Sequence, residues 1–419
     1  MSKNSITPIK FKSFLNHWSY TRLKEVKDVR DGTHSSPKYI DNGYLLVTSK
    51  NLTDSGLNLN DVSLISESDY NEINKRSKVE VGDILLGLIG TIGKPVLVEI
   101  DGFAIKNVGL IKNGGKIQNQ FLLQYLKTNL FNKYIQIEMA GNTQKFLGLE
   151  TLRNTKVPVP SPEEQSAIGS LFRTLDDLLA SYKDNLTNYQ SLKATMLSKM
   201  FPKAGQSVPE IRLDGFEGEW ECLKIAEIFQ IIDGDRGKSY PGESDFYSVG
   251  HTLFLDTGNV KKSGLDFSTT KFISEEKDKE LRNGKLILGD FILTSRGTLG
   301  NVAYYNENIQ KRYSSVRINS AMLILRPLLG DKISPDYILA VLRGNLISDF
   351  MKVNQVGSAQ PHITKKEFSK IKVLVPSNIR EQQAIGAYFS NLDNLINSYR
   401  EKISQLETLK KKLLQEMFI

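Results

Sequence analysis

The chain has 419 residues, of which 40% are hydrophobic and 24% charged, the proportions of an ordinary globular protein. Its formal net charge is +8 and its isoelectric point is about 9.1, which is compatible with a polyanionic partner but does not establish one. The single cysteine, Cys222, excludes a disulfide framework and a thiolate metal cluster, and no apolar run reaches the roughly 18 residues of a membrane span. We therefore expect a cytoplasmic protein.

The first segment, residues 1–157, is predicted to be an α+β domain with mostly short strands. Its β-branched and aromatic runs are separated by Gly, Asn and Asp, the pattern of strands and hairpins. Residues 121–136 have the periodicity of a helix. Trp18 and the pair Asp31-Gly32 open the segment.

Residues 158–202 are predicted to form a long helix. Prolines precede it, and Glu163 and Glu164 lie in its first turn, both typical of a helix start. Apolar residues recur at alternating spacings of three and four, which indicates a left-handed coiled coil. The predicted seam consists of Ile168, Leu171, Leu175, Leu178, Tyr182, Asn185, Tyr189, Leu192 and Met196.

The rest of the chain, residues 203–373 and 374–419, repeats this arrangement. From Gln165 and Gln382 onward the two helices match at a constant offset of 217 residues. Their seams are interrupted by a polar residue at the same place, Asn185 and Lys402. The second seam consists of Ile385, Tyr388, Leu392, Leu395, Tyr399, Lys402, Leu406, Leu409 and Leu413.

The globular segments also resemble each other, including a predicted helix at 336–351. The matching pairs are 49–59 with 257–267, 82–98 with 289–305, and 141–146 with 357–363. A duplication of this length predicts an internal pseudo-twofold. We expect an α+β fold with two pseudo-twofold-related α/β domains separated by two long helices that pair as an antiparallel coiled coil. The alternative is two unrelated amphipathic helices, each packed on its own domain.

Two glycine-rich stretches, 87–95 and 232–240, are similar to phosphate-binding loops but lack required residues. The P-loop pattern needs glycine where the chain has Leu88 and Ile232, and Ser or Thr where it has Pro95. None of the four histidines has a metal-ligand spacing, and no catalytic acid, base or metal group recurs in both halves. What recurs is Gly, Thr, Gln and polar loops, which indicates a recognition surface.

The ordered, duplicated set of segments resembles the specificity subunit of type I restriction–modification enzymes over essentially the whole chain. The resemblance rests on DGTHSSPKYIDNGYLLVTSKNL near the start, the pair GDIL…GTIG and GDFIL…GTLG, and the helix starts PSPEEQSAIG and PSNIREQQAIG. It implies target recognition domains at 1–157 and 203–373, a central coiled-coil helix at 158–202 and a C-terminal one at 374–419.

The resemblance also implies a function and partners. Each domain would read one half of a bipartite target in double-stranded DNA, and the differences between the domains predict an asymmetric target. Two methylation subunits would dock on the helices and supply S-adenosylmethionine. Restriction subunits, which translocate DNA and cut it, would use ATP and Mg²⁺. The chain itself would be non-catalytic, with no cofactor and no metal of its own.

Candidate DNA-contacting residues follow from the chemistry of recognition. Base edges are read by Arg, Lys, Asn, Gln, Ser and Thr on loops, and phosphates are bound by Lys and Arg. The first domain offers Thr33, His34, Ser36, Lys38, Ser49, Lys50, Asn51, Thr91, Lys94, Gln144 and Lys145. The second offers Asp235, Arg236, Lys238, Ser239, Asn259, Lys261, Lys262, Arg296, Thr298, Gln360 and His362. We expect a third to a half of them to touch DNA, and Gly90, Gly93, Gly297 and Gly300 to shape the backbone.

Two other functions remain open from the sequence. The chain could be the DNA-reading subunit of a different restriction or modification system, or a structural coiled-coil adaptor that binds no DNA. A DNA reader would bind random duplex with an affinity that falls steeply with salt, whereas an adaptor would not.

Overall fold

The computed structural model describes residues 14, 17–140, 146–203, 205–354 and 362–418. The chain divides into two compact units. Unit 1 comprises Met1–Lys183 and Lys402–Ile419, and unit 2 comprises Asp184–Glu401. Two long helices, α6 (Pro162–Lys199) and α13 (Ile379–Glu416), each begin in one unit and end in the other.

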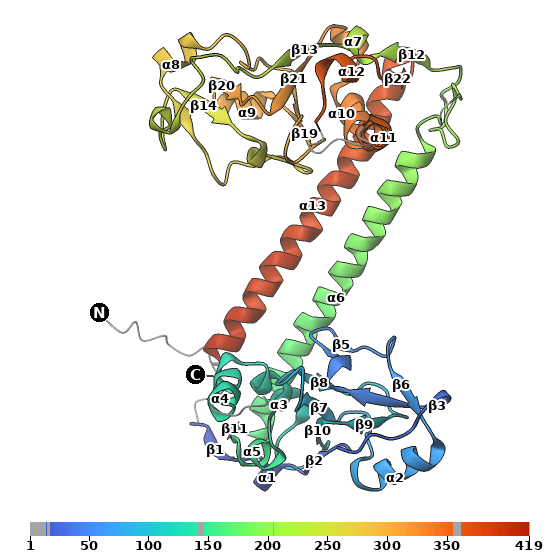
Figure 1. Ribbon diagram of the computed structural model, residues 1–419, viewed down its shortest axis with the longest axis vertical. Coiled ribbons are helices and arrows are strands. Elements are labelled where there is room, and N and C mark those ends of the chain that lie inside the picture. The colour runs from blue at the N-terminus through green and yellow to red at the C-terminus, as the bar shows by residue number, and fades with distance from the viewer. Residues whose placement is uncertain (1–13, 15–16, 141–145, 204, 355–361, 419) are drawn as a thin grey trace. The chain divides into compact units, whose positions relative to one another are not determined.

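Unit 1 is a mixed α and β structure (Figure 1). Its strands are β1 (Ser19–Arg22), β2 (Val29–Asp31), β3 (Tyr39–Thr48), β4 (Leu52–Thr53), β5 (Gly56–Leu57), β6 (Ser63–Ile65), β7 (Ile84–Gly87), β8 (Pro95–Leu97), β9 (Ala104–Lys106), β10 (Val108–Ile111) and β11 (Lys156–Val159). Its shorter helices are α1 (Leu23–Val26), η1 (Ser49–Asn51), α2 (Glu67–Ser77), α3 (Asn119–Leu126), α4 (Asn129–Glu138) and α5 (Leu149–Asn154).

Unit 2 follows nearly the same order of elements. Its strands are β12 (Glu221–Lys224), β13 (Phe229–Asp233), β14 (Thr252–Leu255), β15 (Val260–Lys261), β16 (Gly264–Leu265), β17 (Phe272–Ile273), β18 (Phe291–Thr294), β19 (Val302–Tyr304), β20 (Val316–Ile318), β21 (Met322–Pro327) and β22 (Lys372–Val375). Its shorter helices are α7 (Ile225–Ile228), η2 (Glu243–Asp245), η3 (Thr257–Asn259), α8 (Glu275–Glu280), α9 (Glu307–Arg312), η4 (Gly330–Lys332), α10 (Pro335–Arg343), α11 (Asn345–Asn354) and α12 (Lys365–Phe368).

The two units share one sheet topology. Unit 1 has a four-stranded antiparallel sheet in the order β2-β10-β7-β8 and a three-stranded sheet β6-β3-β9, in which β3 and β9 are parallel. Unit 2 repeats this as β13-β21-β18-β19 and β17-β14-β20, again with its parallel pair, β14 and β20. The internal repeat that the sequence predicts therefore extends to strand order and strand direction.

One of the two inner strands of each four-stranded sheet, β7 in unit 1 and β18 in unit 2, illustrates burial on both faces. In unit 1, Ile84 and Leu86 of β7 pack toward the core that contains α3 and the long helices, whereas Leu85 packs toward the three-stranded sheet. In unit 2, Phe291 and Ile292 of β18 face two different cores in the same way. This explains why these strands have continuous apolar runs rather than alternating ones.

Each helix predicted before the long helices is in fact two helices. The stretch 121–136 divides at Lys127 and Thr128, because the Thr128 hydroxyl accepts a hydrogen bond from the N–H of Phe131 (3.2 Å) and caps α4. The corresponding stretch, 336–351, divides at Gly344, which ends α10.

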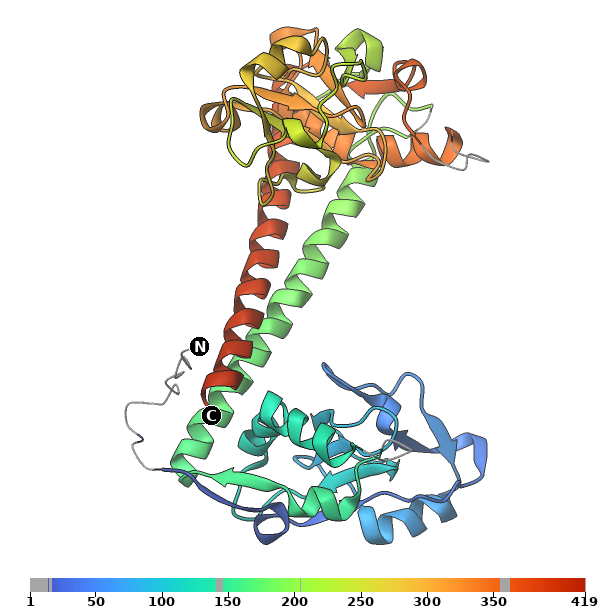
Figure 2. The same ribbon diagram turned by 60° about the vertical axis from the view of Figure 1, so that its left-hand side comes forward.

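Within each unit the segments of α6 and α13 run antiparallel. In unit 1, Asp176 pairs with Lys410, and Lys183 Nζ lies 2.8 Å from Glu407 Oε1. The segments of the two helices within unit 1 also lie side by side in the second view (Figure 2). In unit 2, Lys193 Nζ lies 2.5 Å from Asp393 Oδ1.

The predicted helix seam needs a correction. Counted in sevens from Ile168 and from Ile385, the predicted seam residues are buried or half-buried, as expected. Ile168, Leu175, Ile385 and Leu392 are buried. The residues between them are not those predicted: Phe172, Leu179, Phe389, Ile396 and Ile403 are buried, one position after each predicted residue. Of the predicted residues at these positions, Leu178, Leu192, Leu395, Lys402 and Leu409 are exposed, and Leu171, Asn185 and Tyr388 are half-buried. Both sets follow a 3–4 spacing, so periodicity alone could not choose between them.

The end of each long helix packs into the opposite domain. Phe418, just beyond α13, packs within unit 1, with its ring centroid 5.7 Å from that of Trp18 and 5.6 Å from that of Phe121. Phe201, just beyond α6, packs in unit 2 against Trp220 (6.2 Å) and Tyr337 (5.9 Å). The Met-Phe pair after each long helix and the tryptophans Trp18 and Trp220 therefore belong to the hydrophobic cores.

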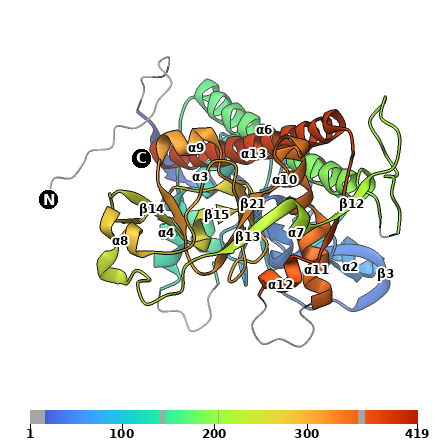
Figure 3. The same cartoon turned by 90° about the horizontal axis from the view of Figure 1, so that it is seen from above.

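The start of each long helix is attached to its domain by a repeated glutamine. Gln165 accepts a hydrogen bond from the N–H of Gln118 (2.8 Å) and donates to the carbonyl of Pro160 (2.9 Å). Gln382 does the same with Ser334 (2.8 Å) and Pro376 (2.8 Å). In unit 2, α10 lies close to α13 (Figure 3). Gly386 permits this approach, since a Cβ at that position would lie 2.6 Å from the backbone nitrogen of Tyr337.

Candidate nucleic-acid interface

The loops of unit 1 that contain predicted DNA contacts meet around Asn107. This residue follows β9 and has a positive φ of 56°. Its N–H donates to the carbonyl of Thr33 (3.1 Å), and its own carbonyl accepts from the hydroxyl of Ser49 (3.0 Å) and the N–H of Leu88 (3.4 Å). One residue thus joins the loop after β2, η1 and the turn between β7 and β8.

The imidazole of His34 is held at both nitrogens. Nδ1 lies 2.9 Å from Asn107 Oδ1, and Nε2 lies 2.8 Å from Asp31 Oδ2. Asp31 is buried and also pairs with the guanidinium of Arg76, which comes from α2. His34 remains exposed, so this chain of contacts presents a ring of fixed orientation to solvent.

The turn between β7 and β8 depends on glycine. Gly90 and Gly93 have φ values of 78° and 75°, which side chains rarely adopt. In unit 2 the turn between β18 and β19 has Gly297 and Gly300 at 69° and 82°. The four glycines therefore shape the backbone, as expected.

A buried asparagine holds the loop after each parallel strand. Asn51 accepts from the N–H of Thr48 (2.9 Å) and donates to the carbonyls of Asn58 (3.2 Å) and Asp61 (2.9 Å). Asn259 makes the same three bonds, with Asp256 (2.9 Å), Asp266 (3.0 Å) and Thr269 (2.8 Å). Both amides are buried and fully used by these contacts, so they position the loops and are not included among the DNA contacts proposed below.

Asp235 has a similar positioning role in unit 2. Its carboxylate accepts from the N–H groups of Gly237 (2.8 Å), Arg282 (2.6 Å) and Asn283 (3.3 Å). Burial by itself would raise the pKa of Asp235, but these backbone donors lower it below its ordinary value. The segment 278–283 is braced in turn by Arg317, which is buried and pairs with Asp278.

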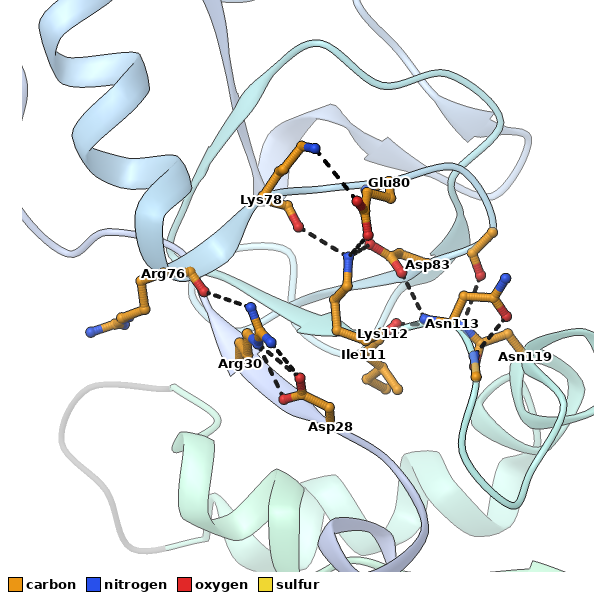
Figure 4. A network of polar contacts seen from close by, with 12 residues as sticks. Asp28, Arg30, Arg76, Lys78, Glu80, Asp83, Ile111, Lys112, Asn113 and Asn119 are labelled. Carbon is orange, nitrogen blue, oxygen red and sulfur yellow. Dashed lines mark hydrogen bonds and ion pairs between the residues drawn. The ribbon is translucent and has the colours of Figure 1, made fainter.

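A buried carboxylate also precedes the strand that leads to each glycine turn. Asp83, at the start of β7, accepts from Lys112 Nζ (2.6 Å) and from the N–H of Asn113 (2.7 Å), as Figure 4 shows. Burial alone would lower the pKa of Lys112, but its hydrogen bonds to Asp83 and Glu80 raise it. Asp290 in unit 2 is paired instead with Arg326 (2.8 Å).

Most of the other predicted contact residues lie on exposed or half-exposed loops. Lys106 Nζ donates to the hydroxyl of Ser36 (2.8 Å), and Lys50 and Lys94 each lie 3.2 Å from an aspartate. Ser49 is buried. The other exposed or half-exposed residues of the prediction are Thr33, Lys38, Thr91, Arg236, Lys238, Ser239, Lys261, Lys262, Arg296, Thr298 and His362. Gln144, Lys145 and Gln360 lie outside the described residues.

In unit 2 the predicted residues also gather into one set of loops. Arg236 donates to the carbonyl of Ser320 (3.2 Å), and the Thr298 hydroxyl donates to the carbonyl of Thr257 (3.3 Å). The N–H of Ile363 donates to the carbonyl of Ser295 (3.0 Å) and places His362 beside the glycine turn. The backbone thus brings together in each unit the segments that the sequence predicts.

Residues 16–188 and 217–408 match the family model described as the type I restriction modification DNA specificity domain. The chain belongs to this DNA specificity family of type I restriction–modification systems. The two matched regions correspond to the two halves of the internal repeat.

Similar proteins agree with this assignment. The chain is 24% identical to a putative type I restriction enzyme MjaX specificity subunit of Methanocaldococcus jannaschii, over 95% of this chain and 92% of that protein. It is 23% identical to the MjaVIII specificity subunit of the same organism, over 81% and 79%. A crystal structure of a type I S subunit from M. genitalium has the same fold, with a TM-score of 0.66 at 17% identity over 99% of each chain.

The residues that organise the specificity-domain loops were missed by sequence reasoning. Asn107, Asp31 and Arg76 carry the chemistry of a hydrogen-bond network, but they are far apart in the sequence and follow no motif. The Gly-Asp pair at the start of both β7 and β18 was visible in the repeat, and it could have indicated that Asp83 and Asp290 are structural.

A row of exposed leucines flanks the buried helix seam. At 100° per residue, Leu178 and Asp176 lie on opposite flanks of Leu175, and Leu409 and Glu407 lie on opposite flanks of Leu406. Equivalent flanks of antiparallel helices face the same side, so the leucines occupy one side of the pair in unit 1 and its ion pairs the other. Their exposed fractions are 37% for Leu178 and 43% for Leu409.

Unit 2 has the same row, with Leu395 at 41% and Leu192 at 38% exposed.

In the part of the chain that the structure describes, no three His, Cys, Asp or Glu side chains group as a metal site. Nor does any described helix combine the length and hydropathy that a membrane span requires.

Proposed function

We propose that the chain is the subunit that selects the DNA target of a type I system, and that each unit reads one half of a bipartite, asymmetric sequence. The observation that carries the proposal is the pair of loop clusters: the same backbone frame occurs twice and carries different side chains each time. A shared frame suits two similar docking events on duplex DNA, and different side chains suit two different half-sites.

The chemistry of the clusters supports binding to a duplex. Exposed Lys38, Lys238, Lys261 and Lys262 offer phosphate contacts, whereas half-buried Thr33 and exposed Arg236 and Thr298 offer hydrogen bonds to base edges. Arg236 is already oriented by its hydrogen bond to the carbonyl of Ser320 (3.2 Å), which reduces the entropy lost on binding. Both ring nitrogens of His34 are used within the cluster, so His34 orients the loop after β2.

We propose that methylation subunits dock on the long helices, one at each leucine row. An apolar row beside an already buried seam is what an additional amphipathic helix would cover. One row includes Leu178 and Leu409 and the other Leu395 and Leu192, so the chain offers two equivalent surfaces. Two surfaces suit two copies of a partner.

In this proposal the chain carries out no chemistry itself. S-adenosylmethionine would be bound by the methylation subunits, and ATP and Mg²⁺ by the restriction subunits, as the resemblance to specificity subunits implies. The chain would contribute only the position of the complex on DNA.

The test is to sequence methylated adenines genome-wide in a host that expresses the methylation subunits with and without this chain. The expected result is one discontinuous motif, with two different half-sites separated by unread base pairs, that disappears when the chain is absent. A palindromic or continuous motif, or methylation that does not depend on the chain, would contradict the proposal.

A further inference from the structure

The two glycine turns share two positive-φ glycines and two backbone hydrogen bonds, which align them residue by residue. The N–H of Gly93 donates to the carbonyl of Gly87 (3.1 Å), and the N–H of Gly300 donates to that of Thr294 (3.0 Å). The N–H of Leu147 donates to the carbonyl of Leu88 (2.8 Å) in unit 1. In unit 2 the corresponding bond joins Ile363 to Ser295 (3.0 Å).

This correspondence pairs Ile89 with Arg296 and Phe146 with His362. In unit 1, Ile89 and Phe146 face each other in an antiparallel bridge, and their side chains are 42% and 47% exposed. In unit 2 both positions carry nitrogen-rich side chains that are exposed. The same place in the frame is therefore apolar in one unit and basic in the other.

From this difference, and resting on the proposed function, we infer that the two turns read opposite classes of base pair. Ile89 and Phe146 would contact the 5-methyl group of a thymine in the half-site of unit 1. Arg296 would donate to O6 and N7 of a guanine in the half-site of unit 2. Apolar side chains are suited to the thymine methyl group, and arginine to guanine, in the major groove.

The shape of the apolar pair favours contact with a methyl group over insertion between bases. An inserted wedge needs a side chain that projects from the surface. Ile89 and Phe146 instead are paired across a β-bridge, and more than half of the surface of each residue is covered by protein. They form a low apolar surface that can lie against a base edge.

Arg296 is available for a base contact. Its backbone N–H is used in a bond to the carbonyl of Ala321 (3.1 Å), which fixes the turn, but no described residue forms a hydrogen bond or ion pair with its guanidinium. Arg236 of the same cluster, in contrast, is held by the carbonyl of Ser320 (3.2 Å) and lies 3.6 Å from Asp233.

The first experiment uses the unaltered chain with its methylation subunits and duplexes that carry the methylated motif. Each thymine of the duplex is replaced in turn by deoxyuridine, which lacks only the methyl group, and each guanine by 7-deazaguanine, which lacks N7. We expect one uridine in the half-site of unit 1 to weaken binding about fourfold, the loss of one buried methyl group. We expect one 7-deazaguanine in the other half-site to weaken it roughly tenfold. Replacements in the unread gap are the control.

The second experiment exchanges the side chains. In Ile89→Arg with Phe146→His, binding should no longer depend on the thymine methyl group, and the methylated motif should gain guanine at that position only. In Arg296→Ile, sensitivity to 7-deazaguanine should disappear. Val81→Arg is the matched control, because it adds the same charge at a 56% exposed apolar residue near the opposite end of β7.

The outcomes separate this inference from the proposed function. If no bipartite motif exists, the proposed function fails. If the motif exists but no thymine of the first half-site is sensitive to loss of its methyl group, this inference fails, whether or not the variants fold. An unchanged motif in a folded, active exchange variant would also overturn it.

Discussion

Gln165 and Gln382 connect each long helix to its own domain by matched sets of hydrogen bonds. Each accepts from one backbone N–H and donates to backbone carbonyls on both sides of the junction. Both are buried, at 1% and 2% exposure. A glutamine side chain provides one acceptor and two donors, so it satisfies several backbone groups that would otherwise be buried without partners.

Replacing Gln382 by methionine should therefore destabilise unit 2. The change preserves the length of the side chain but leaves the N–H of Ser334 and the carbonyl of Pro376 unpaired, and we expect the free energy of unfolding to fall by about 3 kcal/mol. The neighbouring Gln383→Met is the control, because Gln383 is exposed. Equal denaturant midpoints for the two variants would contradict this role.

The buried ammonium group of Lys27 should make the stability of the fold depend on pH. Burial lowers its pKa from 10.5 to about 8, although its ammonium donates to the carbonyls of Lys112 (3.2 Å) and Gly114 (2.5 Å). Between pH 8 and 10.5 the unfolded chain binds more protons at this group than the folded chain, so its contribution to stability rises with pH.

The stability of the unaltered chain relative to Lys27→Met should accordingly rise between pH 8 and pH 10, by at most ~1 kcal/mol per pH unit. Denaturant unfolding of both proteins at several pH values measures this difference. A difference in stability that stays constant or falls with pH would show that burial does not lower the pKa of Lys27.

At the scale of elements, the long helices show what sequence periodicity can and cannot determine. The repeat, the helix starts and every seventh seam residue follow from the sequence, because the offset of 217 residues preserves all of them. The choice between Leu178 and Leu179 does not, because adjacent leucines both fit a 3–4 spacing. Packing decides it: Leu179 is 7% exposed and Leu178 37%.

Substitutions at Leu178 and Leu179 can distinguish an effect on folding from an effect on partner binding. Leu178→Glu should leave the free energy of unfolding within about 0.5 kcal/mol of the original, since the residue is exposed, but weaken capture of the methylation subunit. Leu179→Glu should destabilise the helix pair by several kcal/mol, because it buries a charge. Thermal unfolding and co-purification measure the two effects. Full partner binding by a folded Leu178→Glu protein would place the docking surface elsewhere.

The candidate interface could be predicted only in part, and for a physical reason. Residue type and loop composition identify which segments form it, and the structure brings those segments together. They do not distinguish a side chain used within the loop from one that faces solvent. Asn51, Asn259 and Asp235 have the right chemistry for base contacts, yet their polar atoms are used by backbone groups of their own loops.

Over the whole molecule, the same structural arrangement occurs twice. Strand order, the parallel strand pair, the glutamine at each helix start and the aromatic cluster at each helix end all recur. What differs is the set of exposed side chains on the loops, as at Ile89 and Arg296. In the proposed function, a repeated scaffold with independent surfaces would let the two half-sites change separately.

The measurement that tests this most directly is a methylation map of a chimaera. Residues 203–373 are replaced by the corresponding segment of a specificity subunit that has a different target, and α6 and α13 are kept. One half of the methylated motif should change to that of the donor while the other half stays as it was. A change in both halves, or an active chimaera with an unchanged motif, would show that the two units do not read DNA independently.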